Sequence, residues 1–379
     1  MQSLTVPTGD RNPNGYAAAD VLEALQAPHG SRRFSFRYEL LDSTNATVEP
    51  EIFGVLSGEV SNNHLADIKR TARFNILETG TIDYLSDRIR PHARLHLYPY
   101  TVDDFVEWPL GVFLLSTPVR HIDRFGRITR DVAAYDQLQV FTDEVTTDRY
   151  TVAAGANVVA AVTTLLGGIP ASIEPSTATL VTAKEWDPGT TKLKIINELL
   201  GMINYESLSF DEDGLAIVQA YRSPTERAVE YTYATDQSGL MVPEADQELD
   251  LFAVPNQWTL VVTEPDQPVL TSTYTNNDPG SPTSTVRRAR TISDFRIEVE
   301  AVDQATLDAK VARLAFEASQ VYEALEFSTA VMPIHSGNDV IHIQFDPLAI
   351  NHKYAEQTWT LPLRAGATMT HRARRVVTV

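Results

Sequence analysis

The order of strand and turn residues between positions 106 and 134 decides the fold. Residues 106–115 read VEWPLGVFLL, residues 123–126 read DRFG, and residues 128–134 read ITRDVAA. Aliphatic, aromatic and β-branched residues of this kind favour strands, and Gly126 can take the positive φ that a tight turn requires. The three stretches therefore predict strand, hairpin and strand, in a chain rich in β structure.

The same pattern extends toward the N-terminus. Phe34, Phe36 and Tyr38 alternate with other residues, as do Leu95 and Leu97, so both stretches are predicted as strands with one apolar face. Before residue 32 the sequence mixes Asp, Asn, Gly and Pro with one short helical pattern over residues 17–26. We therefore expect an N-terminal arm at 1–31 and a first β-rich domain at 32–150.

Residues 151–228 are predicted to form a small α+β domain. Apolar residues recur at helical spacing within 153–166 and within 190–203, and Gly167 follows the first of these helices as a stop signal. The acidic turn at 211–214 (DEDG) lies between two short apolar stretches, which is typical of a hairpin.

A connecting segment at 229–257 precedes a second β-rich domain at 258–379. Asp303 is expected to cap the one helix of this domain. Residues 275–285 (TNNDPGSPTST) contain too few apolar residues to pack and are expected to form a mobile loop. Strands are expected at 258–262, 269–274, 295–299, 323–332, 339–346, 356–363 and 368–378.

Composition excludes several classes of protein. The 379 residues include no cysteine, which rules out disulfides, thiolate metal sites and cysteine nucleophiles. Hydrophobic residues make up 43% of the chain and charged residues 21%, as in ordinary globular proteins. No apolar run is long enough for a membrane span, and the N-terminal residues do not resemble a secretory signal.

The charge of the chain is strongly acidic. The net charge of −19 argues against a protein that binds nucleic acid, because an excess of acids cannot neutralise phosphates. Residues 171–270 hold 17 acids and five bases. This acidic stretch is either a solvated surface or a surface that repels a polyanion, and the sequence leaves both interpretations open.

Signatures of catalysis and metal binding are missing from the sequence. P-loop, dinucleotide-binding, nucleophile-elbow and zinc-protease motifs do not occur. A calcium loop beginning at Asp211 would need Gly and Glu where Ala216 and Arg222 stand. We therefore predict no catalytic, cofactor-binding or metal-binding residue and no cofactor, although a pair of catalytic carboxylates would leave no trace in the sequence.

Two histidine pairs and one basic cluster are candidates for a metal-binding or partner-binding site. His92 and His96 are four residues apart on a predicted strand, which separates them by about 13 Å, too far for one metal ion. His335 with His342 is no better, because His342 is expected on the polar outward face of a strand. The cluster at 69–73 (KRTAR) is predicted to be a solvated turn, with a contact to a partner protein as the alternative.

Several phrases of the sequence resemble the tail hub proteins of long-tailed siphophages, also called baseplate hub-like minor tail proteins, particularly those of actinobacteriophages. The resemblance begins near residue 32 and follows the order of the chain. It rests on DIKRTARFNI (67–76), IDYLSDRIRP (82–91), WPLGVFLLSTP (108–118), LSFDEDGLAIVQAYRSP (208–224), YTYATDQSGLMVP (231–243), DLFAVPNQW (250–258), NDVIHI (338–343) and WTLPLRAGATMTHRARRV (359–376).

The resemblance implies the baseplate-hub fold: mainly β, with two tail-tube-like β-barrel domains at 32–150 and 258–379 joined by smaller α+β domains. It further implies a homotrimer, whose six barrels would form a pseudo-hexameric ring between a sixfold tail tube and a threefold tip. Its partners would be the distal tail protein, the tape measure protein and downstream tip or fibre proteins, with DNA as passing cargo. The protein would be made in the host cytoplasm and reside at the distal end of the virion's tail.

The hub interpretation carries two further expectations. The protein would be structural and not an enzyme, with a tail-associated cell-wall hydrolase and a receptor- or glycan-binding module as the alternatives. The lumen of the ring would be acidic, because a cationic channel would hold DNA phosphates. Glu298 and Glu300 are expected on a charged strand face, with Ile297 and Val299 packed inside the barrel wall.

Overall fold

Strands dominate the structure, which accounts for the β-rich pattern of the sequence. The computed structural model describes residues 1–27, 32–78, 80, 82–97, 103–235, 240–249, 251–263, 268–297, 299–320 and 323–376. Strands make up 41% of the chain and helices 16%. Among the described residues, no helix combines the length and apolar character that crossing a membrane requires.

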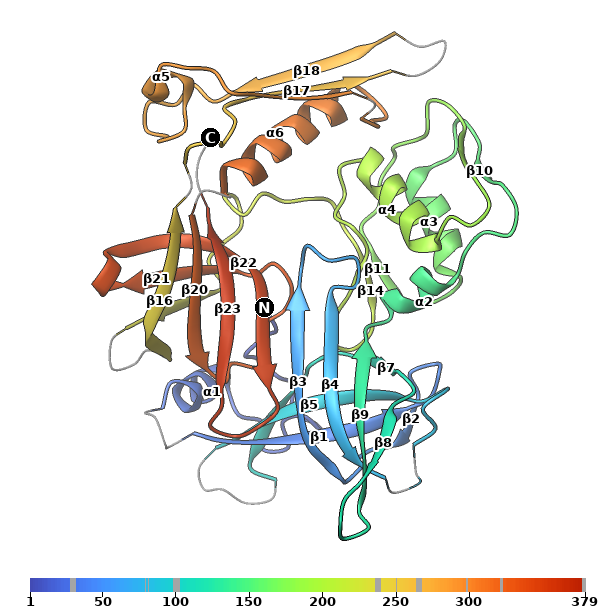
Figure 1. The fold of residues 1–379 in the computed structure, drawn as a ribbon, viewed down its shortest axis with the longest axis vertical. Helices are drawn as coiled ribbons and strands as arrows, with labels where there is room; N and C mark the ends of the chain where they lie inside the picture. The colour runs from blue at the N-terminus through green and yellow to red at the C-terminus, as the bar shows by residue number, and fades with distance from the viewer. Residues whose placement is uncertain are drawn as a thin grey trace.

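One large sheet of 15 strands forms the centre of the molecule (Figure 1). Four further strands branch from its main path: β15 (Tyr231–Ala234) and β21 (Val340–Phe345) beside β22, β6 (Phe105–Pro109) beside β5, and β8 (Val119–Ile122) beside β9. The main path runs in the order β16 (Met241–Leu249), β20 (Glu323–Ala330), β23 (Thr368–Arg375), β22 (Ile350–Pro362), β3 (Val55–Asn63), β4 (Arg70–Leu77), β9 (Ile128–Tyr135), β7 (Phe113–Leu115), β5 (Arg88–His96), β1 (Arg33–Leu41) and β2 (Thr47–Glu49).

The expectation of two closed β-barrels is wrong, because over the residues that the structure describes this sheet is open and contains no closed barrel. Strands β3 and β22 join the two halves of the sheet in antiparallel register, from Thr358 opposite Asn63 to Pro362 opposite Glu59. Hydrophobic periodicity predicts which residues form strands, but it does not say which strand edges pair. The sequence pattern therefore does not predict the pairing of β3 with β22.

A single hydrophobic core lies against both halves of the sheet. Phe74 and Trp108 of the first half and Tyr354 and Trp359 of the second half belong to one cluster of buried side chains. Helix α1 (Ala18–Leu25), predicted from the helical pattern at 17–26, packs its buried residues Val21 and Leu25 into the same core. Side chains of both halves therefore pack in one contiguous core.

The middle of the chain forms an α+β unit with a core of its own. The predicted helices are present as α3 (Val158–Leu166) and α4 (Lys192–Met202), and α3 ends at Gly167 in the left-handed conformation. The predicted hairpin is present as β13 (Ser209–Phe210) and β14 (Ala216–Val218). The other elements of the middle unit are α2 (Leu138–Asp143), β10 (Tyr150–Val152), β11 (Ala171–Ile173) and β12 (Lys184–Trp186).

A third layer covers one end of the molecule (Figure 1). Here β17 (Gln257–Val262), β18 (Leu270–Thr275) and β19 (Ser293–Ile297) form a separate three-stranded sheet against α6 (Gln304–Gln320). Asp303 caps α6 as predicted, since its carboxylate accepts a hydrogen bond from the backbone N–H of Thr306 at 2.7 Å. These strands do not join the main sheet, whereas β15 and β16, from the stretch expected only to connect two domains, do.

Two expectations about this third layer are wrong. The loop at 275–285 packs through hydrogen bonds rather than apolar contacts: the amide nitrogen of Asn276 donates to the hydroxyl of Ser281 at 2.9 Å, and Thr283 is fully buried. Thr285 begins the short helix α5 (Thr285–Arg288). Ile297 is 60% exposed rather than packed inside a barrel wall, and Glu298 lies outside the described residues.

Candidate functional site: an uncovered sheet face and a buried histidine cluster

The two faces of the main sheet have opposite character. Side chains alternate between faces along a strand, and one face of β16, β20, β23, β22, β3, β4 and β9 packs on the core. The other face carries small polar and charged side chains, which align across the strands. Register places the members of this polar face side by side: Asp246, Glu326, Arg372 and Thr358 in one row, and Pro362, Glu59, Arg73 and Ala133 in another.

The polar face is hollowed in both halves of the molecule. A depression of about 570 Å³ lies over β3, β4 and β9, lined by residues that include Glu59, Arg73 and Asp131. A second depression of about 630 Å³ lies over β16, β20 and β23, lined by residues that include Asp246 and Glu326. Charged, polar and apolar residues line both depressions.

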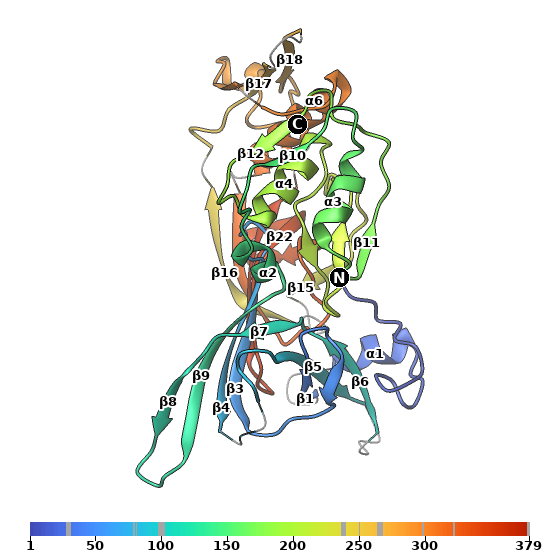
Figure 2. The ribbon, with the colours of Figure 1, turned by 90° about the vertical axis from the view of Figure 1, so that its right-hand side faces the viewer.

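The strands at the two ends of the polar face differ in charge. Strand β8 pairs with β9 and leaves its other edge open, and the β8–β9 hairpin extends away from the body of the molecule (Figure 2). Val119, Ile122 and Phe125 of the hairpin are 68%, 72% and 71% exposed. Residues 119–130 contain four arginines and one aspartate. At the opposite end, β16 pairs with β20 and carries Glu244, Asp246 and Glu248.

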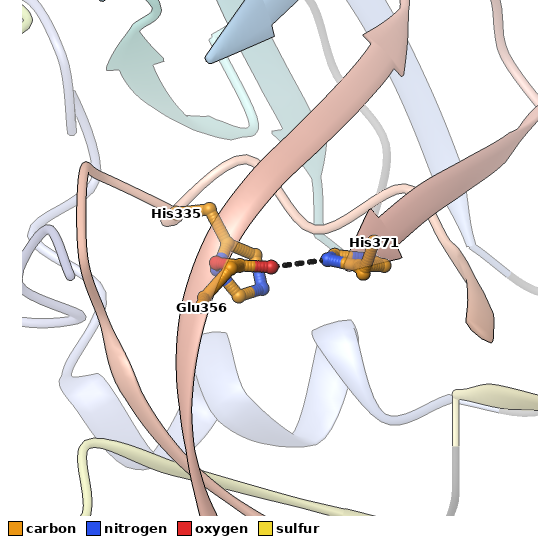
Figure 3. A group of neighbouring side chains, drawn as sticks. All are labelled: His335, Glu356 and His371. Carbon is orange, nitrogen blue, oxygen red and sulfur yellow. Dashed lines mark hydrogen bonds and ion pairs between the residues drawn. The ribbon is translucent and has the colours of Figure 1, made fainter. Parts of the chain in front are cut away.

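A second candidate site lies inside the second half, where His335, Glu356 and His371 meet (Figure 3). Glu356 comes from β22, His371 from the adjacent strand β23, and His335 from the loop before β21. The Nδ1 atom of His335 lies 2.6 Å from one carboxylate oxygen of Glu356, and Nδ1 of His371 lies 2.5 Å from the other. The carboxylate therefore bridges the two imidazole rings.

The remaining polar atoms of this histidine cluster also have partners. Nε2 of His335 lies 2.5 Å from the hydroxyl of Tyr233, and Nε2 of His371 lies 2.8 Å from the hydroxyl of Thr329. Asp339 accepts a hydrogen bond from the N-terminal amine of Met1 at 2.6 Å. The cluster therefore ties β22, β23, the loop before β21 and the N-terminus together.

Charge balance assigns the protonation states of the cluster. Burial works to lower the pKa of His335, but the carboxylates of Glu356 and Asp339 raise it to about 9. Burial lowers the pKa of His371, so this ring is neutral near pH 7. Positive His335 and the Met1 amine then balance negative Glu356 and Asp339, and the buried charges sum to zero.

The histidine cluster contains three residue types that bind metals, but its geometry is that of a hydrogen-bonded network. Nitrogen and oxygen ligands around a zinc ion lie about 2 Å from the metal and about 3 Å or more from one another. The 2.5 Å between His371 and Glu356 is instead the distance of a direct hydrogen bond, and Nδ1 of His335 makes its hydrogen bond to Asp339 at 3.0 Å while it lies in ion-pair contact with Glu356. The arrangement fits a structural lock, with each histidine fixed by a carboxylate and a hydroxyl.

The first half buries a different cluster around His92. The two ring nitrogens of His92 each lie 3.0 Å from a carboxylate, one of Glu39 on β1 and one of Glu107 on β6. The Arg37 guanidinium pairs with Glu107 at 2.5 Å. Burial works to raise the pKa of Glu39, but hydrogen bonds from His92 and Thr47 and the charge of Arg90 lower it to about 2. All these groups have protein partners.

The structure separates the histidine pairs that the spacing had brought together. His96 contacts the hydroxyl of Ser35, away from the two carboxylates around His92. His342 is partly exposed and contacts the amide oxygen of Asn351, whereas His335 is buried and has other partners. The true neighbours of His335 are Glu356 and His371, which no linear spacing identifies because strand pairing brings them together.

The interpretation of Lys69 and Arg70 as a solvated turn is wrong. Both side chains are buried, with 7% and 4% of their surface exposed. Arg70 pairs at 2.7 Å with Glu212, which belongs to the acidic turn of the middle unit. The acidic turn is thus a hairpin, as predicted, and it also joins the middle unit to the main sheet.

The fold has relatives among solved structures, although no family model matches the chain and no curated protein matches its sequence. A tail protein from Neisseria meningitidis MC58 has 12% identity and a TM-score of 0.63, covering 90% of this chain and 96% of its own. The 43 kDa tail protein of prophage MuSo2 from Shewanella oneidensis has 9% identity and a TM-score of 0.60, covering 89% and 98%.

A third relative is prophage tail protein gp18 from Listeria monocytogenes EGD-e, with 14% identity, a TM-score of 0.50, and coverage of 89% of this chain and 94% of its own. Identities this low establish the fold alone. The chain has the fold of phage tail proteins, and the likeness extends over nearly its whole length.

Proposed function

We propose that the protein is a structural hub of a phage tail tip, in which three copies form a ring around a channel. The observation that carries this proposal is the open main sheet, whose polar face extends from the acidic strand β16, at one end of the main path, to the basic strand β8, which branches from β9. Among the described residues, β8 pairs with β9 alone and β16 with β20 alone, and open strand edges of this kind invite pairing with other chains.

The two free edges complement each other as a head-to-tail contact would require. The basic, partly apolar β8–β9 hairpin of one copy would meet the acidic strand β16 of the next copy. A contact between two different surfaces of the same chain closes into a ring when the rotation between copies permits it. The polar faces would then line the channel, and a closed barrel would exist only in the assembled ring.

A trimer is the assembly that the two-half architecture favours. Each chain offers two halves joined through β3 and β22, so three chains would offer six and could adapt a sixfold tail tube to a threefold tip. The distal tail protein, tape measure protein and downstream tip or fibre proteins would be the partners at the distal end of the tail. The siphophage and actinobacterial setting rests on the sequence resemblance.

The proposed channel would carry DNA without binding it. The polar face holds more acids than bases in the rows around Glu59, Asp131, Asp246 and Glu326, against Arg73 and Arg372. Like charge on the wall would prevent phosphates from exchanging their counterions for protein cations. The role would be mechanical, with no chemistry contributed by this chain.

The experiment that tests this function is a measurement of copy number, combined with imaging of the tail tip. Mass photometry of the purified protein is expected to give three copies, and antibody labelling of virions is expected to mark the distal end of the tail. Zymography on cell-wall polymer is expected to show no cleavage, and a glycan array no binding. Cleavage that one Asp or Glu substitution abolishes would support the hydrolase alternative instead.

A further inference from the structure

A cavity of about 300 Å³ lies where four parts of the molecule meet. His64 and Lys69 come from the turn between β3 and β4, Tyr221 from the end of the middle unit, Arg313 from α6 and Arg374 from β23. In this acidic chain the lining holds as many cations as acids: Lys69, Arg313 and Arg374 against Asp67, Glu317 and Glu356.

Lys69 is the most deeply buried of the three cations, with 7% of its surface exposed. Its ammonium donates to the backbone carbonyl of His64 at 3.1 Å and to the hydroxyl of Ser207 at 2.7 Å. Within the part of the chain that the structure describes, no carboxylate oxygen lies within 4.0 Å of its nitrogen. Burial of an ammonium group without a counter-charge is costly.

Arg374, like Lys69, has no carboxylate partner among the described residues. Its guanidinium is half-buried, and over the described ranges it makes no ion pair with any carboxylate. Burial and the neighbouring charge of Arg372 both lower the pKa of Arg374. The protein therefore holds two cations beside one cavity without giving either an acidic partner, although its acids outnumber its bases by 19.

The third cation is held in a fixed orientation. The Arg313 guanidinium stacks 4.0 Å above the ring of Tyr221, and its Nε pairs with Glu317 at 2.8 Å. Its Nη1 donates to the carbonyl of Tyr205 at 3.2 Å. The other two carboxylates of the lining belong to Asp67 and to Glu356, and the two histidines of the histidine cluster already engage Glu356.

The field of these cations is visible at a neighbouring group. Burial, together with the charges of Lys69, Arg313 and Arg227, lowers the pKa of His64 to about 3. His64 is therefore neutral and can donate from one ring nitrogen near pH 7. The Tyr221 hydroxyl is buried and makes no hydrogen bond to the described residues, so it is a further unused donor.

We propose that this cavity binds a small oxyanion of the phosphate or carboxylate class, held by Lys69 and Arg374 with Arg313 as the third cation. Guanidinium and ammonium groups are the usual partners of such anions, and a volume of about 300 Å³ admits one together with water. The anion would pair directly with Lys69 and Arg374, which make no ion pair with the described carboxylates. It would also join the main sheet, the middle unit and α6 at one point.

Anion binding predicts a saturable stabilisation of the full-length protein. Inorganic phosphate at constant ionic strength, balanced with sodium chloride, is expected to raise the thermal midpoint until the cavity is filled. Citrate forms a second arm that distinguishes a carboxylate ligand from a phosphate. Titration calorimetry then gives the Kd of whichever anion binds.

Two substitutions and one control identify the site. Lys69→Met and Arg374→Gln are each expected to weaken the anion at least tenfold, while Arg149→Gln removes an exposed cation paired with Glu185 in the middle unit and is expected to leave the Kd unchanged. If Lys69→Met fails to fold, the half-buried Arg374 still provides the test. Absence of any shift with both anions, or an unchanged Kd in Arg374→Gln, would overturn the proposal. Copy number is measured separately, so failure of the ring and failure of the anion site are distinguishable.

Discussion

The two halves of the main sheet bury carboxylates by different means. In the first half, Glu107 faces Arg37 and Arg94, whose guanidinium groups stay charged at any pH the protein can survive. In the second half, Glu356 and Asp339 face His335 and the Met1 amine, which lose their charge as pH rises. Similar buried networks can therefore lose their stabilising effect at opposite ends of the pH scale. The type of cation in each network decides at which end this happens.

The halves also end differently. In the first half the basic β8–β9 hairpin branches from the main path, and in the second half the acidic strand β16 ends this path. Their polar faces are continuous through β3 and β22, so the molecule presents one wall with two unlike ends. This asymmetry is what a head-to-tail ring requires, whereas a pair of identical ends would favour a twofold dimer.

The largest expected effect comes from breaking the histidine cluster of the second half. Glu356→Gln removes the carboxylate that bridges both rings and leaves the His335 charge with Asp339 as its one close acidic partner. Loss of one member of a buried ion pair costs about 3–5 kcal/mol. Urea denaturation of Glu356→Gln is expected to show this loss. The exposed Glu326, changed to Gln, is the control and should lose less than about 1 kcal/mol.

The pH dependence of stability sharpens the same contrast. The pKa of His335 in the folded protein is about 9, above the ordinary value of 6.5, so its contribution is complete below about pH 6.5 and is lost as pH rises through 9. The Met1 amine, whose pKa is also raised, acts in the same direction. The denaturation midpoint is expected to fall between pH 7 and 9. His335→Gln should flatten this slope, and an equal slope in that variant would refute the assignment.

The first half should respond on the acidic side. The pKa of Glu39 is lowered to about 2, and the pKa of Glu107 is also lowered, because burial is outweighed by hydrogen bonds from His92 and the charge of nearby arginines. Their contribution is present above about pH 4.5 and is lost as pH falls toward 2. Glu39→Gln is expected to reduce the acid sensitivity of the denaturation midpoint and leave its slope between pH 7 and 9 unchanged.

How far the sequence predicts this molecule depends on whether an interaction is local. Helix α6 and its cap Asp303, the stop at Gly167 and the hairpin turn ending at Gly214 follow from residues close together in the chain. The pairing of β3 with β22 and the meeting of His335, Glu356 and His371 depend on which strands lie side by side. Hydrophobic periodicity carries no information on that choice.

The burial of two polar segments also differs from what their composition predicts. Lys69 and Arg70 looked solvated because charged residues usually are, but Glu212 and Ser207 supply partners from the middle unit. The loop at 275–285 looked unable to pack, but Asn276 and its neighbours satisfy one another's hydrogen bonds. In both cases a partner distant in sequence, or a network within the loop, offsets the cost of burial.

Reversing the charge of the β8–β9 hairpin tests its proposed contact with β16 of the next copy. Arg124→Glu with Arg127→Glu on the hairpin is expected to weaken the association of copies about tenfold, because rim charges of opposite sign steer and hold such contacts. Glu244→Lys with Asp246→Lys on β16 should restore assembly when combined with the hairpin changes. Arg149→Glu, far from both ends in sequence, is the matched control. Sedimentation measures the dissociation constant, and failure of the compensating pair to restore it would contradict the contact.

The smallest effect is expected at the junction of the halves. Ser61 on β3 and Thr360 on β22 share a hydrogen bond of 2.9 Å. Thr360→Val removes it and is expected to cost about 1 kcal/mol. Because both halves share one core, tryptophan fluorescence and circular dichroism should still report a single transition. Two separate transitions would show that the halves unfold independently.

The most direct test of the ring is a cryo-electron microscopy reconstruction of the assembled protein or of the tail tip. We predict three copies around a channel, with β8 of each copy beside β16 of the next and with Glu59, Asp131 and Glu326 facing the lumen. A monomer, a ring of six chains, or a trimer whose polar sheet faces point away from the channel would contradict it.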